Sequence, residues 1–318
     1  MQNPSSEDFN VTHVTEFLIV GTEQGLKNFY VELSFFILVV YIMILIGNLI
    51  IFTLVMTNYK LRTPMYIFLG NLSFIDIVIA TSVHPKFITM VLQNDFTITF
   101  SGCFIQMYVY LGVQTVEGFL LCVMAYDRYV AICNPLRYSS IISGRVCAVM
   151  VTVAWVSGLL MPCFSVIFAS QLPFCNTGVK FWFCDYPAVV WLSCWDTTFL
   201  IDVALSIAVV VMYIPFMLIV WSYYRIVLAI CKIATSEGRI KAFSTCSSHL
   251  TVVLAFYLAH SCVYISAKVL KNNSNMLILI SIINSALVPV LNPLIYTFRN
   301  KEIKDALQKL CCHVKRQS

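Results

Sequence analysis

The chain has 318 residues, of which 60% are hydrophobic and 11% are charged. Soluble domains usually carry about 25% charged residues, so a chain this apolar cannot cover its surface with polar groups in water. The composition therefore excludes an ordinary soluble domain and indicates a membrane protein.

Apolar segments long enough to cross a membrane follow one another along nearly the whole sequence. A transmembrane helix needs roughly 20 mainly apolar residues, and short polar clusters separate seven such segments: 30–56, 64–84, 100–126, 146–168, 199–229, 242–266 and 275–297. We therefore expect an all-α bundle of seven transmembrane helices (30–297). An N-terminal segment (1–29) precedes the bundle, and a tail with a short amphipathic helix (298–318) follows it.

Basic residues gather at one end of these helices. Of the 20 lysines and arginines, the other end holds only Lys27, Lys86, Lys180, Lys268 and Lys271. Because cytoplasmic loops collect Lys and Arg, this bias predicts an extracellular N-terminus and a cytosolic C-terminus. The net charge of +5 is then explained by the basic residues at the cytosolic end and does not indicate binding to nucleic acid. We expect a multi-pass plasma-membrane protein that contacts the lipid bilayer and no nucleic acid.

The segments expected outside the cell carry two kinds of modification signal. Asn10 begins an Asn-Val-Thr sequence that fits the N-glycosylation pattern. The longest connection, about 169–198, contains Cys175, Cys184 and Cys194, and Cys103 lies at the start of the third helix. Disulfides are expected on this oxidising side, although four cysteines permit three pairings.

Two carboxylates lie deep within expected helices, Asp76 in the second and Glu117 in the third. Ionisable groups are costly inside a membrane, so both should face the interior of the bundle. They could share a cation or a proton there. Alternatively, they are neutral acids that hydrogen-bond to Asn48, serines or the backbone.

Polar motifs also occur in the third and seventh helices. Asp127-Arg128-Tyr129 ends the third helix, and taken alone it could consist of side chains that reach the membrane surface. The seventh helix contains Pro289 and Asn292-Pro293. Proline removes a backbone donor and kinks a helix, so this segment could be a hinge or a static kink.

Several separated motifs agree with one family. They are Leu61-Arg62-Thr63-Pro64-Met65-Tyr66, Met124-Ala125-Tyr126-Asp127-Arg128-Tyr129-Val130-Ala131-Ile132-Cys133, Ser222-Tyr223, Lys241-Ala242-Phe243-Ser244-Thr245-Cys246-Ser247-Ser248-His249-Leu250 and Pro289-Val290-Leu291-Asn292-Pro293-Leu294-Ile295-Tyr296. In this order and spacing, from about residue 17 to residue 310, the sequence resembles the odorant receptors, which are rhodopsin-like G-protein-coupled receptors.

This resemblance implies disulfides from Cys103 to Cys184 and from Cys175 to Cys194. It implies a sodium-binding role for Asp76 and Glu117, with no other cofactor. It also implies coupling to a stimulatory olfactory-type heterotrimeric G protein and a rise in cyclic AMP. The coupling and switch residues would be Asp127, Arg128, Tyr129, Tyr223, Lys241, Asn292, Pro293 and Tyr296.

In such receptors the ligand lies between the outer halves of helices three, five, six and seven. Helical spacing of three and four residues, counted from Glu117, Arg128 and Tyr257 as inward positions, predicts which side chains of helices three and six line that site. Helices five and seven offer two further side chains each. They are Met107, Tyr110, Leu111, Gln114, Thr115, Ile207, Val211, Tyr257, His260, Ser261, Tyr264, Ile282 and Ser285. This lining is mostly apolar with a few hydrogen-bonding groups, as is usual for small-molecule sites.

The side chains of this lining limit which classes of ligand are expected. The outer part of helix three lacks an acid, which disfavours an amine ligand. His260 could donate a hydrogen bond to a small odorant or could make a structural hydrogen bond to a neighbouring helix. Odorant receptors often have glycine where Leu258 stands, so this leucine is expected to narrow the site.

Other classes fit the sequence less well. A transporter should show internal repeats and broken helices near the midplane, and the sequence has no such repeat. An enzyme would need a catalytic cluster, whereas His249 and His260 lack metal-ligand spacing. We therefore expect a receptor that is not an enzyme. The main alternative is a rhodopsin-like receptor for a peptide or lipid ligand.

Overall fold

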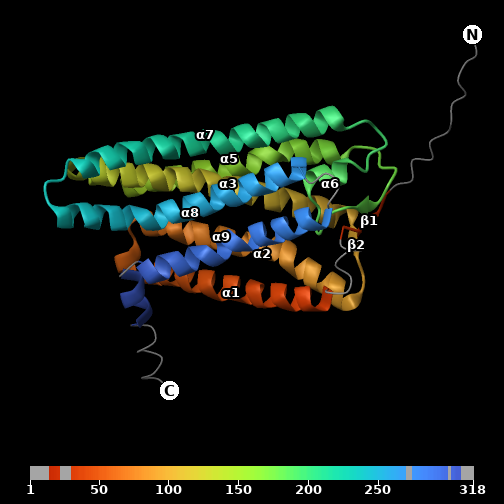
Figure 1. The fold of residues 1–318 in the computed structure, drawn as a ribbon, viewed down its shortest axis with the longest axis horizontal. Coiled ribbons are helices and arrows are strands. Elements are labelled where there is room, and N and C mark those ends of the chain that lie inside the picture. The colour runs from red at the N-terminus through yellow and green to blue at the C-terminus, as the bar shows by residue number, and fades with distance from the viewer. Residues whose placement is uncertain (1–13, 22–29, 270–273, 300–301, 309–318) are drawn as a thin grey trace, which may run out of the picture.

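Seven long helices form a single bundle (Figure 1). The computed structural model describes residues 14–21, 30–269, 274–299 and 302–308. The long helices are α1 (Tyr30–Thr57), α2 (Pro64–Gln93), α3 (Phe100–Cys133), α5 (Gly144–Ser170), α7 (Thr198–Cys231), α8 (Ser236–Val269) and α9 (Ser274–Arg299). All seven are long and apolar enough to cross a membrane, which confirms the expected fold class.

Some helices extend beyond the apolar segments that predicted them. α2 continues to Gln93 with Pro85 inside it, although the apolar segment ends near residue 84. α8 begins at Ser236, before the expected residue 242. Composition identifies only the apolar middle of a helix, whereas backbone hydrogen bonding continues into the polar layer at the membrane surface.

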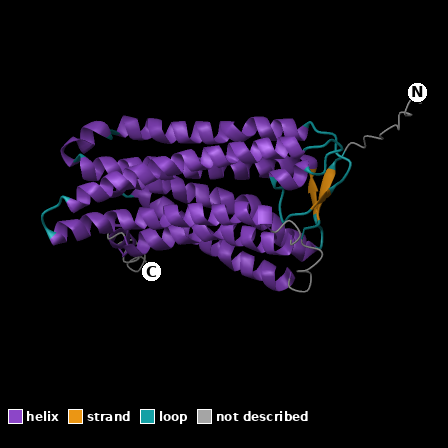
Figure 2. Ribbon diagram, turned by 45° about the horizontal axis from the view of Figure 1, so that its top comes forward, coloured by secondary structure: helices purple, strands orange, loops and turns teal. Residues whose placement is uncertain are grey.

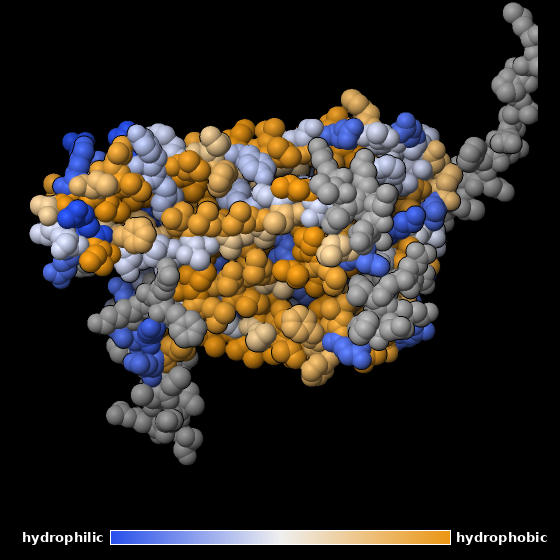
Figure 3. All heavy atoms as spheres, in the orientation of Figure 1, coloured by the Kyte–Doolittle hydropathy of each residue, from blue (hydrophilic) through white to orange (hydrophobic). Residues whose placement is uncertain are grey.

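The outer surface of the bundle is suited to lipid. Large apolar side chains such as Phe164, Phe199 and Met217 are exposed, and Figure 3 shows a broad hydrophobic region along the bundle with hydrophilic residues concentrated toward its two ends. Exposed apolar patches of this extent are rare on soluble proteins. The surface therefore agrees with insertion in a bilayer.

Small residues allow the helices to approach closely. A Cβ added to Gly158 of α5 would lie 2.5 Å from Val116 Cγ2 of α3. A Cβ added to Gly47 of α1 would lie 2.9 Å from Pro293 Cγ of α9. Such contacts are typical of membrane bundles, because lipid tails supply no hydrophobic driving force and close packing must stabilise the helix pairs.

A small three-stranded sheet lies at one end of the bundle (Figure 2). β1 (Glu16–Ile19) pairs antiparallel with β2 (Thr97–Thr99) and parallel with β3 (Gly178–Val179). Phe17 of β1 is buried against the rings of Phe100, Phe104 and Phe174. The sequence did not predict this sheet, because strands of two to four residues are too short to show a reliable period.

The opposite end carries shorter helices. Tyr59–Leu61 and Pro135–Arg137 are single 3₁₀ turns, and α4 (Tyr138–Ile141) follows the second of them. Residues 302–308 form a helix in which Ile303 and Ala306 are buried, as expected for an amphipathic segment. Asn10, the expected glycosylation site, lies outside the described residues.

We predict that Gly158→Val destabilises the receptor. The added side chain overlaps Val116 on α3, and overpacking of a close contact costs about 1–3 kcal/mol. Thermal unfolding of the detergent-purified protein should show a lower midpoint. The matched control is Gly144→Ala, because a Cβ at Gly144 meets nothing within 4 Å. Equal midpoints for Gly158→Val and the unchanged protein would contradict this account of the α3–α5 contact.

Candidate functional site

A cavity of about 210 Å³ opens between the helices at the end that carries the sheet. Residues 171–197, which connect α5 to α7 and are called the outer loop here, contribute to its wall. The remaining wall comes from α3, α5, α7, α8 and α9. The lining residues are Tyr110, Leu111, Gln114, Thr115, Met161, Pro162, Ser165, Phe181, Phe183, Asp185, Tyr186, Pro187, Ala204, Leu205, Ile207, Ala208, Val211, His260, Val263, Tyr264, Ser281 and Asn284.

Most of the residues expected from helical phase border this cavity. They are Tyr110, Leu111, Gln114, Thr115, Ile207, Val211, His260 and Tyr264. On α3 and α8, helical phase therefore predicted four polar side chains that share this cavity: Tyr110, Gln114, His260 and Tyr264.

Five expected lining residues do not border the cavity: Met107, Tyr257, Ser261, Ile282 and Ser285. On α9 the cavity meets Ser281 and Asn284, each one residue before the expected position. One residue turns a helix by about 100°, so a small error in phase selects the neighbouring face. Ile282 and Ser285 are instead buried, and Ser285 lies 3.4 Å from His84 Nε2.

The other three residues contact neighbouring side chains or the bundle core. Met107 is buried in the hydrophobic core. Tyr257 packs against Phe216, with ring centroids 4.5 Å apart. The Ser261 hydroxyl lies 2.7 Å from the Tyr213 hydroxyl. These residues lie on the correct helices but make helix–helix contacts.

Leu258 does not narrow the site. Its side chain is 63% exposed and is absent from the cavity lining, because it lies on the outward face of α8. The expected effect of this leucine on the pocket is therefore wrong.

Three polar side chains of the cavity contact one another. Gln114 Nε2 lies 3.4 Å from the Tyr110 hydroxyl and contacts His260 Nε2, which joins α3 to α8. His260 Nδ1 lies 2.8 Å from the Phe256 carbonyl oxygen. When Nδ1 carries the proton it donates to that carbonyl, and Nε2 can then accept from the Gln114 amide. His260 therefore makes a hydrogen bond between helices and also borders the cavity.

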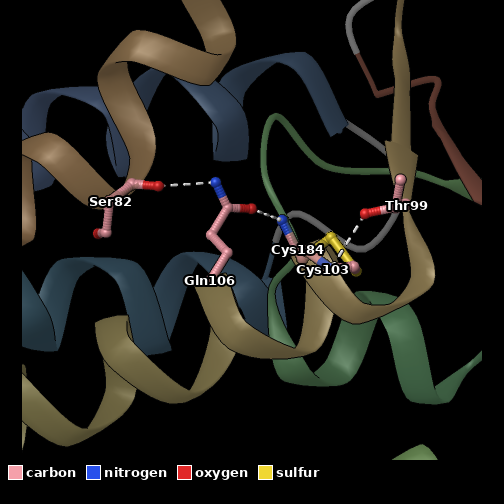
Figure 4. The surroundings of a disulfide bond; sticks show 6 residues. Ser82, Thr99, Cys103, Gln106 and Cys184 are labelled. Atoms are coloured by element: carbon pink, nitrogen blue, oxygen red, sulfur yellow. Dashed lines mark hydrogen bonds between the residues drawn. A yellow bond between two sulfur atoms is a disulfide. The ribbon is translucent and has the colours of Figure 1, made fainter.

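The outer loop is attached to the bundle at several points. The structure joins Cys103 to Cys184 and Cys175 to Cys194, the pairing that the resemblance implied. Figure 4 shows Gln106 of α3 between Ser82 and Cys184. Its amide nitrogen donates to the Ser82 carbonyl (2.8 Å), and its oxygen accepts from the Cys184 backbone N–H (3.0 Å).

Trp182 provides a further attachment for the outer loop. Its indole N–H donates to the Ser281 hydroxyl of α9 at 2.6 Å, and its ring makes an edge contact with Phe87 of α2. The loop is thus tied to α2, α3 and α9, so its residues form a fixed wall of the cavity.

Asp185 is one of several cavity-lining residues that were not expected from the sequence, and it carries a carboxylate. It follows Cys184 directly and borders the cavity from the outer loop. Burial raises the pKa of its carboxyl to about 6, because a low-dielectric surrounding disfavours the charged form. The expectation against amine ligands rested on the lack of an acid in the outer part of helix three. The position of Asp185 beside a cysteine linked to α3 was the available signal.

A second polar cluster lies in the middle of the bundle. The Asn292 amide donates to Asp76 Oδ2 at 2.8 Å, and the Asn48 amide donates to the Pro289 carbonyl at 2.9 Å. Asp76 and Glu117 are buried and interact electrostatically. Within the described part of the chain, oxygens of Asp76, Glu117, Asn48 and Asn292 lack a hydrogen-bond partner.

The third cluster lies at the cytosolic end of α3. Arg128 Nε donates to Asp127 Oδ2 at 2.9 Å, and Arg128 forms an ion pair with the same carboxylate. The Tyr138 hydroxyl donates to Asp127 Oδ1 at 2.7 Å. Burial and this hydrogen bond raise the pKa of Tyr138 above its ordinary value, so the hydroxyl stays protonated. The Asp127 carboxylate therefore fixes the position of the Arg128 guanidinium, and the Tyr138 hydroxyl fixes the position of that carboxylate.

The remaining candidate switch residues surround this cluster. The Tyr129 ring lies 5.3 Å from Trp221 of α7, and the Tyr223 hydroxyl lies 2.7 Å from His249 Nδ1 of α8. Tyr296 is buried, and it follows Pro293 by one helical turn in α9. Lys241 lies in α8, but its side chain is outside the described part of the structure.

Comparison with known proteins gives one consistent result. A family profile described as "Olfactory receptor" matches residues 37–314. The human protein olfactory receptor 2K2 is 42% identical over 306 residues, which cover 96% of this chain and 95% of the relative. Human olfactory receptor 5AN1 is 42% identical over 311 residues, covering 95% and 98%. The olfactory receptor-like protein OLF3 of Canis lupus familiaris is 41% identical over 308 residues, covering 95% of each chain.

Proposed function

Because this chain belongs to the olfactory receptor family, we propose that it binds a small odorant in the outer cavity and activates a stimulatory olfactory-type heterotrimeric G protein. Cyclic AMP then rises. Members of this family are multi-pass receptors of the plasma membrane and are not enzymes. The residues that carry ligand binding and coupling belong to the proposal.

The observation that supports a small odorant as the ligand is the volume of the cavity. A volume of about 210 Å³ exceeds the roughly 150 Å³ of an engineered cavity that holds benzene, but it lies below the usual range of drug-sized sites, about 300–1,000 Å³. A volatile molecule of roughly ten non-hydrogen atoms fits this space. A peptide or a membrane lipid does not, which makes the alternative receptor classes less suitable.

The contact between Gln114 and His260 links ligand binding to helix movement. It joins α3 to α8 at the cavity wall, so a ligand that inserts there changes how these helices pack. A ligand shifts two conformations only through its different affinity for each. We propose that the bound odorant favours an outward swing of the cytosolic half of α8.

Such a swing would open a cleft for the G protein near Arg128. The Tyr223–His249 contact holds the cytosolic halves of α7 and α8 together, and it would break as α8 moves. Arg128, Tyr223, Lys241 and residues 230–240 would then line the cleft. Asn292 and Pro293 in α9 would permit the rearrangement of Tyr296, because a proline leaves the helix one backbone hydrogen bond short.

The ligand site is tested with a panel of volatile and water-soluble odorants in a cell-based cyclic-AMP assay. We expect His260→Ala or Gln114→Ala to change the potency of at least one active odorant by roughly tenfold, the effect of losing about 1.4 kcal/mol of binding. Leu258→Ala is the control, because Leu258 lies on the same helix and faces outward.

Unchanged potency for every active ligand in both cavity variants would remove the pocket assignment. A response to peptides or lipids alone would refute the odorant proposal.

Removal of the Tyr138 hydroxyl should raise basal signalling. Tyr138→Phe leaves Asp127 Oδ1 without this donor and loosens its hold on Arg128. Hydrogen bonds to charged groups contribute about 1.5–3 kcal/mol, so basal cyclic AMP should rise by roughly threefold or more. Tyr224→Phe is the control, because Tyr224 is exposed at the same end of the bundle. Equal basal cyclic AMP in Tyr138→Phe and the unchanged receptor, at equal surface expression, would contradict the proposal that these hydrogen bonds restrain Arg128.

We also propose that Asp76 and Glu117 bind a sodium ion. Two nearby carboxylates cannot both ionise cheaply without a cation. Asp76, Glu117, Asn48 and Asn292 each have an oxygen without a hydrogen-bond partner among the residues that the structure describes, and oxygen is the ligand type that small hard cations prefer. The bound ion would stabilise this packing of α2, α3 and α9. The alternatives are that the two acids share a proton, or that they are neutral and hydrogen-bond to Asn48, serines or the backbone.

Replacement of choline by sodium at constant ionic strength should raise the thermal midpoint of the purified receptor, because a ligand of the folded state stabilises that state. Asp76→Asn and Glu117→Gln should abolish the rise. Asp202→Asn, at an exposed acid of α7, should retain it. The sodium site is refuted if all four proteins show the same midpoint change.

A further inference from the structure

Among the described residues that line the outer cavity, Asp185 is the only one with a carboxylate, and none is a lysine or an arginine. It reaches the cavity from the outer loop and not from a helix. Its position follows from the disulfide between Cys184 and Cys103, because the next residue in the chain is held against the outer end of α3. The carboxylate is therefore a fixed feature of the cavity wall.

This carboxylate has no cationic partner among the described side chains. The backbone of Tyr186 interacts with it, which leaves acceptor capacity, because a carboxylate has about four lone-pair sites. With a pKa of about 6, the group is mostly ionised at pH 7.4. A half-buried negative charge without a counter-charge favours a ligand that brings one.

The surroundings of Asp185 divide the cavity into a polar and an apolar part. Tyr110 of α3 and Tyr264 of α8 lie close enough to interact electrostatically with its charge. The α7 wall, in contrast, consists of small and aliphatic side chains such as Ala204, Ala208 and Val211. The cavity thus suits a molecule with one hydrogen-bond-donating head and a hydrocarbon body.

We propose that Asp185 is the specificity-determining acceptor of this cavity and that the ligands include small protonated amines. The ammonium group would bind the carboxylate, and the hydrocarbon part would lie against α7. This inference rests on the proposed function, since it names the ligand class of the same cavity. It also reverses the expectation that amines are disfavoured, which considered acids on helix three alone.

The proposed pairing predicts an order among ligands of equal size. Charge-assisted hydrogen bonds are roughly twice as strong as neutral ones, so an amine should gain more from Asp185 than an alcohol does. An aldehyde has no donor and gains nothing. A carboxylate ligand is repelled by the like charge.

The test measures cyclic-AMP dose responses to heptylamine, heptanol, heptanal and heptanoate, and to benzylamine, benzyl alcohol, benzaldehyde and benzoate. Receptor at the cell surface is quantified in parallel. Asp185→Asn should weaken the potency of the amines by roughly tenfold and that of the alcohols by about threefold or less. Aldehyde potency should stay unchanged. Asp185→Glu should keep the amine response, because it keeps the charge.

Asp196→Asn is the matched control, because Asp196 lies in the same loop with an exposed carboxylate that accepts from the Thr198 backbone N–H at 3.0 Å. It should change no potency. Equal loss of potency for amines and aldehydes in Asp185→Asn would indicate a structural role and overturn the proposal. If that variant fails to reach the surface, the unchanged receptor decides: amines more potent than the matched carboxylates support the pairing, and the reverse order refutes it.

The two proposals fail separately. Responses to alcohols or aldehydes without any response to amines would refute the role of Asp185 and leave the odorant-receptor function intact. Absence of a cyclic-AMP response to every compound here and to the wider odorant panel would refute both.

Discussion

The disulfide between Cys103 and Cys184 determines where the outer loop lies, and therefore which loop residues form the wall of the cavity. It joins residues 81 positions apart in the sequence and fixes the outer loop across the mouth of the bundle. Gln106 reinforces the link through the Cys184 backbone N–H. The neighbours of Cys184, Phe183 and Asp185, consequently border the cavity. A loop of this length would otherwise sample many conformations, so the covalent link removes much of the entropy that ordering the wall would cost.

The α3 helix connects the three polar clusters of the molecule. Its 34 residues extend about 50 Å, with Gln114 at the cavity, Glu117 in the middle and Arg128 at the cytosolic end. The α8 helix contacts neighbouring helices in both halves, through His260 with Gln114 in the outer half and through His249 with Tyr223 in the cytosolic half. A ligand that disturbs the outer contact acts on the same helix whose contact in the cytosolic half lies near enough to Arg128 to interact with it electrostatically. This gives the proposed switch a physical route.

The proposed switch needs two conformations, and the polar groups inside the bundle differ in how completely they are hydrogen-bonded in this one. Buried polar groups are strongly stabilised only when every partner is satisfied. Both oxygens of the Asp127 carboxylate accept hydrogen bonds, from Arg128 and from Tyr138, whereas one oxygen each of Asp76 and Glu117 has no partner among the described residues. In the proposed switch, the hydrogen bonds of Asp127 stabilise the conformation seen here. The hydrogen bonding of Asp76 and Glu117 could be completed by a cation or by a movement of the helices, so it could differ between the two proposed conformations.

The sequence by itself determined the seven spans, their orientation and the family, because these depend on local composition and on residues close together along the chain. It also placed Tyr110, Gln114, His260 and Tyr264 toward one cavity through helical phase. Only the tertiary structure decided the rest. One residue of rotation moved the α9 wall from Ile282 and Ser285 to Ser281 and Asn284, since helix packing and not periodicity selects the inward face. The crosslink to α3 placed Asp185 in the cavity, and no helical pattern reaches a residue in a loop.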